Sequence, residues 1–195
     1  LPEIISKVKT LGHRPSVTTN GLKLAQPSYV KKLKDAGLRL LLHSMNGADD
    51  DEAYKELDNG KWATVKVRAL DNIFAERLPI NTGTIIARGV NEYVMNRQVE
   101  VFAERAIANG INFNTTPPYN KITPVLRMKS VGMIGRYMEG VSYTIDELTD
   151  MAVYRLGIDK SDIIKTSAGV VKAGPQSGEA LTSYMFPYET EAGKV

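Results

Sequence analysis

The sequence predicts an α/β fold in which parallel strands are covered by helices. Candidate strands and helices alternate along the chain, which is typical of βαβ units. The candidate strand 38–44 is nearly continuous in apolar residues, as expected of a strand in a sheet covered by helices. Several candidate strands also end in small polar residues, as strands do at the ligand-binding rim of a parallel barrel. These observations favour a full or partial barrel over an open doubly wound sheet, although the spacing by itself fits both.

Length and composition are those of a globular domain. The 195 residues are 43% apolar and 24% charged, and no apolar run approaches the roughly 20 residues of a membrane span. The formal charge of +3 comes from scattered side chains, so no DNA partner is expected. The chain has no cysteine, which excludes disulfides and cysteine-bound metals, and no metal site is expected within it. No signal peptide opens the sequence, and a cytoplasmic location is expected.

The elements follow one another in a regular order. A helix is expected from Pro2, leading into the first strand. The candidate strands cover residues 16–19, 38–44, 80–87 and 111–114, with a fifth over 125–134. The candidate helices cover residues 27–35, 62–77, 95–108 and 144–156, each with apolar residues at helical spacing or with a recognisable start or stop signal.

Local signals support several of these helices. Pro27 suits a first turn, and Gly37 suits the stop that follows the same helix. Thr144 with Glu147 three residues later is a capping box. The acidic run 49–52 lacks the alternate spacing of a calcium loop, so a solvated turn that favours the next helix N-terminus is expected there.

The organisation predicted for the chain is a partial barrel over residues 1–140 and a helix-and-hairpin extension over 141–195. The chain opens on Leu1 without a methionine, and 189–193 has the composition of a hairpin turn whose second strand has barely begun. Both ends are therefore expected to be cut.

Three successive strands are followed by polar residues or glycines. Because the carboxyl ends of parallel strands share one edge of a barrel, these residues predict a ligand-binding rim, and ordinary turns and caps are the alternative. The groups are Thr18, Thr19 and Asn20; Ser44, Asn46 and Gly47; and Arg88, Gly89, Val90, Asn91 and Glu92. His43 is expected to be a residue of the barrel wall.

Four short motifs in residues 13–110 resemble radical S-adenosylmethionine (radical SAM) enzymes of the molybdenum-cofactor and SPASM-like branch. They are TTNG at 18–21, SMNG at 44–47, K-x-x-A-L-x-N-I at 66–73 and GVNE at 89–92. Each is weak alone, but together they occur in the order and spacing of the family. The resemblance implies a partial (β/α) barrel of parallel strands of the radical SAM type, with a C-terminal α+β extension.

The resemblance also implies roles for individual residues. Ser44 matches a serine that hydrogen-bonds S-adenosylmethionine, with Asn46 in reach of the same ligand. Lys66 is a candidate partner of the methionyl carboxylate, and a solvated helix lysine is the alternative. The remaining implied contacts are Gly89, Val90 and Asn91 beside the adenine, and Thr19 and Asn20 facing the substrate. Arg136 follows Gly135 in a turn seen in related sequences, with no defined role.

In complete members of this family, a reduced [4Fe–4S] cluster cleaves S-adenosylmethionine to methionine and a 5′-deoxyadenosyl radical, which abstracts hydrogen from the substrate. This chain lacks the C-x3-C-x2-C motif that holds the cluster and the G-G-E segment. The resemblance therefore implies a C-terminal portion, inactive alone, whose partner is the missing N-terminal half of the barrel.

The substrate is left open between small molecules, lipids and peptides, and Ile80-Asn81-Thr82, where GTP-cyclising members place a lysine, speaks against GTP. The rival hypotheses are a barrel lyase or aldolase using Lys66 or Lys129 as a Schiff-base amine, and a non-catalytic binding module on a decayed barrel.

Overall fold

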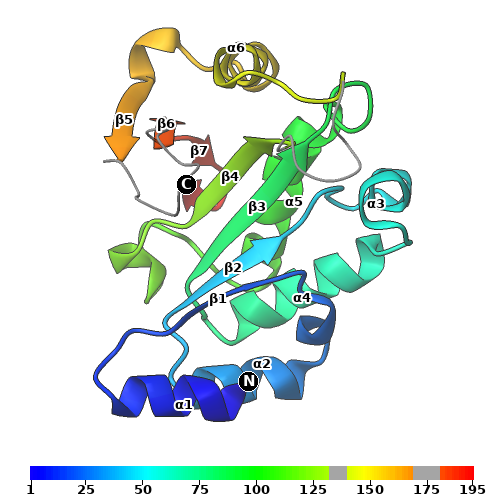
Figure 1. Ribbon diagram of the computed structural model, residues 1–195. Helices are drawn as coiled ribbons and strands as arrows, with labels where there is room; N and C mark the ends of the chain where they lie inside the picture. Colours follow the sequence, from blue (N-terminus) through cyan, green and yellow to red (C-terminus); the bar gives the residue numbers. More distant parts are fainter. Residues whose placement is uncertain (132–139, 169–180) are drawn as a thin grey trace, which may run out of the picture.

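The structure is a computed structural model that describes residues 1–131, 140–168 and 181–195, and its centre is a parallel sheet (Figure 1). The sheet has four strands, and each is parallel to its neighbours. In order across the sheet they are β1 (Ser16–Thr19), β2 (Leu40–Ser44), β3 (Ile80–Ile86) and β4 (Val125–Ser130). This confirms the predicted α/β fold of parallel strands.

Helices connect successive strands. In Figure 1, α5 passes behind β3 and β4, and the strands are seen from the other face of the sheet. The helices are α1 (Pro2–Thr10) before β1, α2 (Pro27–Asp35) between β1 and β2, α3 (Asp51–Asp58) and α4 (Ala63–Ala75) between β2 and β3, and α5 (Val94–Ala108) between β3 and β4. Short 3-10 helices occupy Leu22–Ala25, Tyr119–Lys121 and Lys160–Asp162.

The acidic run before α3 forms the helix start that was expected. The Asp50 carboxylate accepts a hydrogen bond from the Glu52 amide at 2.8 Å, and Asp51 and Glu52 lie in the first turn. Acidic groups are stabilising there because the helix N-terminus carries a partial positive charge.

The prediction of a strand over residues 111–114 is wrong. Ile111 and Phe113 are buried, but they reach the core from a loop, and the Asn112 side chain accepts from the Asn114 amide in a tight turn. Phe113 packs between Phe102 and Tyr119, with ring centroids 5.5 Å away in each case. Residues 13–115 consequently hold three strands of the sheet instead of the four expected, and β4 is the segment predicted as the fifth strand.

The core lies between the sheet and the helices. Leu41 and Ile80 are opposite each other on β2 and β3, and both are almost fully buried in the main apolar cluster. Side chains alternate between the two faces of a strand. Leu126 and Met128 pack into the apolar clusters from β4, so Arg127 between them lies on the other face, which we call the open face.

The extension continues the fold beyond β4. It consists of α6 (Ile145–Leu156), the antiparallel pair β5 (Ile164–Ala168) and β6 (Leu181–Met185), and a terminal hairpin of β7 (Glu189–Thr190) and β8 (Gly193–Lys194). The predicted capping box at Thr144 and Glu147 and the predicted hairpin turn are both present. Arg136 and the last residues of the predicted strand 125–134 lie outside the described residues. Within the described ranges, no helix has the length and apolarity that a membrane span needs.

Candidate functional site

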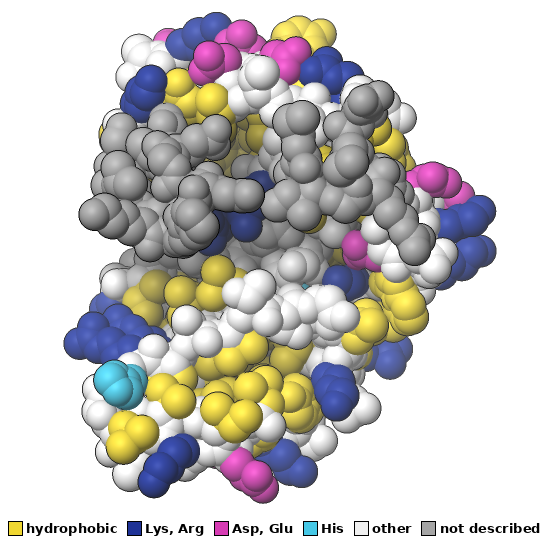
Figure 2. Space-filling view, in the orientation of Figure 1, with side chains coloured by type: hydrophobic (Ala, Val, Ile, Leu, Met, Phe, Trp, Pro, Cys, Tyr) yellow, Lys and Arg dark blue, Asp and Glu magenta, His cyan; other side chains and the backbone are white. Residues whose placement is uncertain are grey.

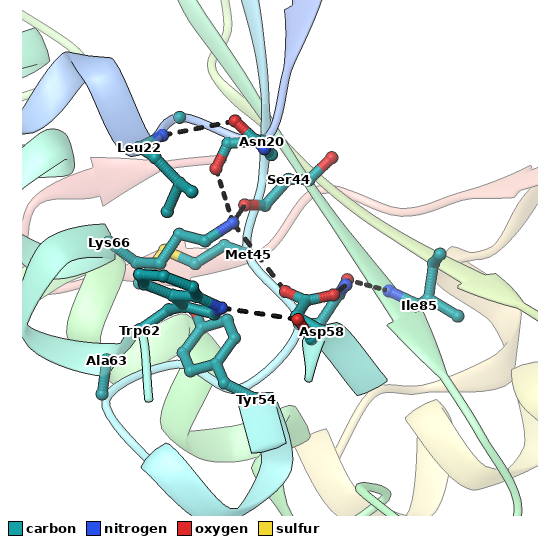
Figure 3. A network of polar contacts seen from close by, with 12 residues as sticks. Asn20, Leu22, Ser44, Met45, Tyr54, Asp58, Trp62, Ala63, Lys66 and Ile85 are labelled. Atoms are coloured by element: carbon teal, nitrogen blue, oxygen red, sulfur yellow. Dashed lines mark hydrogen bonds and ion pairs between the residues drawn. The ribbon is translucent and has the colours of Figure 1, made fainter. Parts of the chain in front are cut away.

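The carboxyl ends of β1, β2 and β3 lie at one end of the sheet, and a buried lysine joins the first two. Lys66 projects from α4 with only 1% of its surface exposed. Its ammonium donates to the carbonyl oxygens of Asn20 at 2.5 Å and Ser44 at 2.8 Å (Figure 3). Asp58 lies 3.9 Å from the same nitrogen, and the Tyr54 ring centroid is 5.5 Å away.

This environment determines what Lys66 can do. Burial lowers the pKa of its ammonium group, and the negative charge of Asp58 acts in the opposite direction. Lys66 is not the solvated helix lysine of the alternative hypothesis. Its contacts hold the ends of β1 and β2 together, so its ammonium is already occupied by protein groups.

Two asparagines extend these contacts to β3. Asn46 donates to Asp58 at 2.9 Å and accepts from the Ile85 amide at 3.0 Å. Asn91 donates to the carbonyl oxygens of Asn46 and Ile85, each at 2.8 Å, and accepts from the Ala87 amide at 2.8 Å. Both side chains are buried, and their amide groups are paired within the protein. They therefore stabilise the carboxyl ends of β2 and β3 and do not themselves offer polar groups to a ligand.

The glycine of the TTNG motif lies directly over a buried histidine. Gly21 has a φ of +79°, and a Cβ there would come within 2.2 Å of His43 Nε2. His43 is 1% exposed, and neither ring nitrogen has a hydrogen-bond partner among the described residues. Desolvation, with a smaller contribution from the nearby charge of Lys66, lowers the pKa of His43 to about 3. His43, which was expected in the barrel wall, is thus a neutral imidazole, and the space next to it at position 21 is large enough only for glycine.

Ser44 offers a hydroxyl at the rim. Its side chain is half-buried, and the bond that the described residues make to Ser44 from a side chain goes to its carbonyl oxygen and not to its hydroxyl. Figure 3 shows this hydroxyl directed away from Lys66. Ser44 pairs in register with Gly83 on β3, where an added Cβ would meet nothing within 4 Å. Among the described residues, no side chain therefore lies close above the glycine next to this hydroxyl.

The GVNE turn is fixed by the segment before α6. The Glu92 carboxylate accepts from the Gly89 amide and from the Tyr143 hydroxyl, and these bonds and others from backbone amides outweigh desolvation to keep the pKa of Glu92 low. The Arg88 guanidinium stacks 4.1 Å from the Tyr143 ring centroid and pairs with Glu147 at 2.8 Å. Gly89 remains exposed, and a Cβ added to it would meet nothing within 4 Å, so its backbone is accessible at the rim.

The two residues expected to face the substrate differ in position. Thr19 pairs in register with buried His43, and its hydroxyl accepts from the Gly21 amide at 3.1 Å. Asn20 is exposed, and its side-chain oxygen accepts from the Leu22 amide at 3.4 Å (Figure 3). Asn20 is the more accessible of the two, because the Thr19 hydroxyl is engaged in the turn.

Only some of the rim residues have groups available to contact S-adenosylmethionine. Ser44 fits as a hydrogen-bonding residue, whereas Gly89 and Val90 fit only as backbone packed beside the adenine, because their amides donate to Glu92 and Ala87. Asn46, Asn91 and Lys66 do not fit as direct ligands, because their polar groups are bonded within the protein. The chain has no cysteine, and the described residues contain no cluster of three or more metal-ligating side chains.

Sequence reasoning missed Asp58, which bonds Asn46 and faces Lys66. A signal was available in part, since Ala53, Tyr54 and Leu57 have the spacing of one helix face. That pattern predicts a helix over this segment, but not which carboxylate approaches the lysine.

Comparisons with known proteins support the motif-based resemblance. No family model matches the chain. It is 27% identical over 118 residues to 7,8-dihydro-6-hydroxymethylpterin dimethyltransferase of Methanocaldococcus jannaschii. That match covers 58% of this chain and 23% of the relative, so the chain spans about a quarter of that protein's length.

Two solved structures have a similar fold. TYW1, solved with a lysine-pyruvate adduct bound, matches 85% of this chain and 47% of its own, with a TM-score of 0.55 and 19% identity. A domain of pyruvate-formate lyase-activating enzyme from Bacteroides vulgatus matches 78% of this chain and 81% of its own, with a TM-score of 0.51 and 13% identity. The comparisons bear out the radical SAM superfamily as the family that this chain resembles, and they show its fold to be part of a radical SAM barrel.

Proposed function

We propose that this chain is the C-terminal part of a radical SAM enzyme, and that its rim contributes contacts to S-adenosylmethionine. The observation that carries the proposal is the Ser44 hydroxyl, which lies at the carboxyl end of β2 next to Gly83, where no other described residue comes within 4 Å of an added Cβ. A hydroxyl can both donate and accept toward an amino acid or a ribose. The curated relative and the two solved structures support the same family.

In this proposal, Ser44 hydrogen-bonds S-adenosylmethionine, and the backbone at Gly89 and Val90 borders its adenine. Lys66, Asn46 and Asn91 are positioning residues, because they fix the strand ends from which these contacts are made. Asn20, exposed at the end of β1, faces the substrate. A [4Fe–4S] cluster would be held by the missing N-terminal half of this cytoplasmic enzyme, and it would supply the electron for reductive cleavage of S-adenosylmethionine and so the radical chemistry of the family.

The experiment adds the upstream half of the barrel. The completed protein, reconstituted anaerobically with iron and sulfide, should bind iron and cleave S-adenosylmethionine when reduced. Ser44→Ala should weaken S-adenosylmethionine binding about tenfold, which corresponds to a hydrogen bond to a polar ligand. Ser16→Ala is the matched control, since Ser16 is an exposed serine at the amino end of β1. Equal affinities for the two variants would refute the role of Ser44, and absence of cleavage would refute the family function.

A second candidate is a Schiff-base lyase or aldolase, and the structure favours Lys129 over Lys66 for its lysine. Lys129 is exposed on the open face, whereas the Lys66 ammonium is bonded to two carbonyls. The lysine amine would add to a substrate carbonyl with loss of water. Incubation with pyruvate and borohydride, which reduces the imine to a stable amine, should label Lys129 if this candidate is correct and leave the chain unlabelled if it is not.

A further inference from the structure

Among the described residues of its four strands, the open face of the sheet carries two basic side chains and no acidic one. Arg127 and Lys129 alternate with the helix-facing Leu126 and Met128 along β4, and both basic residues are exposed. The register places the following residues of the other strands on the same face: Ser16 and Thr18 on β1; Leu40, Leu42 and Ser44 on β2; and Asn81, Gly83 and Ile85 on β3. Figure 2 shows basic atoms near the middle of this side of the molecule.

Arg127 and Ser44 lie in one row across the sheet. Ser44 pairs with Gly83, and Gly83 pairs with Arg127, so the glycine separates the hydroxyl from the guanidinium. Apart from Gly83 and its two chain neighbours, no atom of the described residues lies within 4 Å of the point where a Cβ at Gly83 would be. Among the described residues, the row therefore has polar groups at both ends and no side chain close above the glycine in the middle.

Lys129 lies on the same face, two residues further along β4, and pairs in register with Ile85. Residues two apart on a strand share a face and lie roughly 7 Å apart, which long side chains can bridge. Within the described residues, neither Arg127 nor Lys129 has an ion-pair partner. By contrast, Arg88 in the loop after β3 and Arg97 on α5 are paired with carboxylates.

We propose that Arg127 and Lys129 bind an anionic group of the substrate, a carboxylate or a phosphate, over Gly83 and next to Ser44. The inference rests on the proposed function and gives its substrate a chemical class. A guanidinium recognises either group through two parallel hydrogen bonds, and a lysine adds a point charge. Two cations suit a small molecule, whereas a nucleic acid backbone needs a longer row of positive charges.

The test titrates the full 195-residue chain, labelled with ¹⁵N, with inorganic phosphate and separately with acetate. Saturable shifts are expected at the amides of Gly83, Arg127 and Lys129, and the anion that shifts them at the lower concentration identifies phosphate or carboxylate as the preferred group. Arg127→Gln with Lys129→Gln should weaken binding at least about tenfold, as expected when charged hydrogen bonds are lost. Lys61→Gln removes an equal charge from an exposed lysine between α3 and α4 and should bind like the parent chain.

The variant Arg127→Lys distinguishes an effect of the lost positive charge from an effect of the changed side chain on the fold. It preserves a cation at this position and should retain most of the affinity that Arg127→Gln loses. The inference is overturned if neither anion gives saturable shifts at these amides, or if the Gln variants bind as tightly as the Lys61→Gln control. The titration contains no iron and no S-adenosylmethionine. A negative result would therefore leave cofactor cleavage in the completed barrel untouched, and failure of cleavage would leave a measured anion site standing.

Discussion

Lys66 is a buried cation whose ammonium is bound by two main-chain carbonyls and faced by a carboxylate. Lys66→Met should lower the free energy of unfolding by about 2–4 kcal/mol, because hydrogen bonds to charged groups contribute roughly 1.5–3 kcal/mol each and two buried carbonyls lose their donor. Urea denaturation measures the change. Arg68→Met removes an exposed cation from the same helix and should cost much less. Similar losses for the two variants would contradict this account of the rim.

Gly21 combines a positive φ with a close approach to His43. Gly21→Ala should cost about 1–2 kcal/mol for the left-handed backbone and a further 1–3 kcal/mol for overpacking against the imidazole. Gly12 provides the control, because its φ is +82° and a Cβ there would meet nothing within 4 Å. Thermal unfolding should show the larger loss for Gly21→Ala, and shortening the underlying side chain with His43→Ala should relieve part of it.

Burial of His43 makes stability depend on pH. The pKa of this imidazole is lowered from 6.5 to about 3, so between these values the unfolded chain binds a proton that the folded chain does not. The free energy of unfolding should therefore fall as the pH drops from 6.5 toward 3, by up to about 1.4 kcal/mol per pH unit for one proton. His43→Leu should show a shallower dependence in urea titrations across this range. Exposed His13→Gln should keep the slope of the parent chain.

At the scale of elements, α6 is attached to the barrel by a small apolar contact. Leu148 is 4% exposed and belongs with Ile86 and Met95 to a second apolar cluster. Leu148→Ala should cost about 2–5 kcal/mol of local stability, since a buried leucine loses most of its side chain. Hydrogen exchange should speed up along α6 and remain slow in β2 and β3. Ile145→Ala, at a 44% exposed position of the same helix, should leave exchange nearly unchanged.

At the scale of the whole molecule, the proposed function places the cluster and part of the cofactor site outside this chain. The isolated chain should carry no iron after anaerobic reconstitution and should bind S-adenosylmethionine weakly. A few hydrogen bonds of roughly 0.5–1.5 kcal/mol each do not exceed an association cost of at least about 4 kcal/mol. Calorimetry checks the affinity, and a micromolar dissociation constant would show that the pocket is complete without the cluster.

The sequence by itself determined the parallel α/β class, most helices and the resemblance to radical SAM enzymes. These depend on local signals: the apolar run of 38–44, the capping box at Thr144 and the polar strand ends.

Only the tertiary structure decided which rim residues remain available to a ligand. Asn46, Lys66 and Asn91 have the residue types of ligand contacts, but whether their polar groups are free depends on partners distant in the sequence, such as Asp58 and the carbonyl of Asn20. The segment 111–114 shows the same limit. Its apolar residues are buried, but a loop can bury Phe113 as well as a strand can, so burial did not show that this segment is a strand. The fourth strand of the sheet is β4.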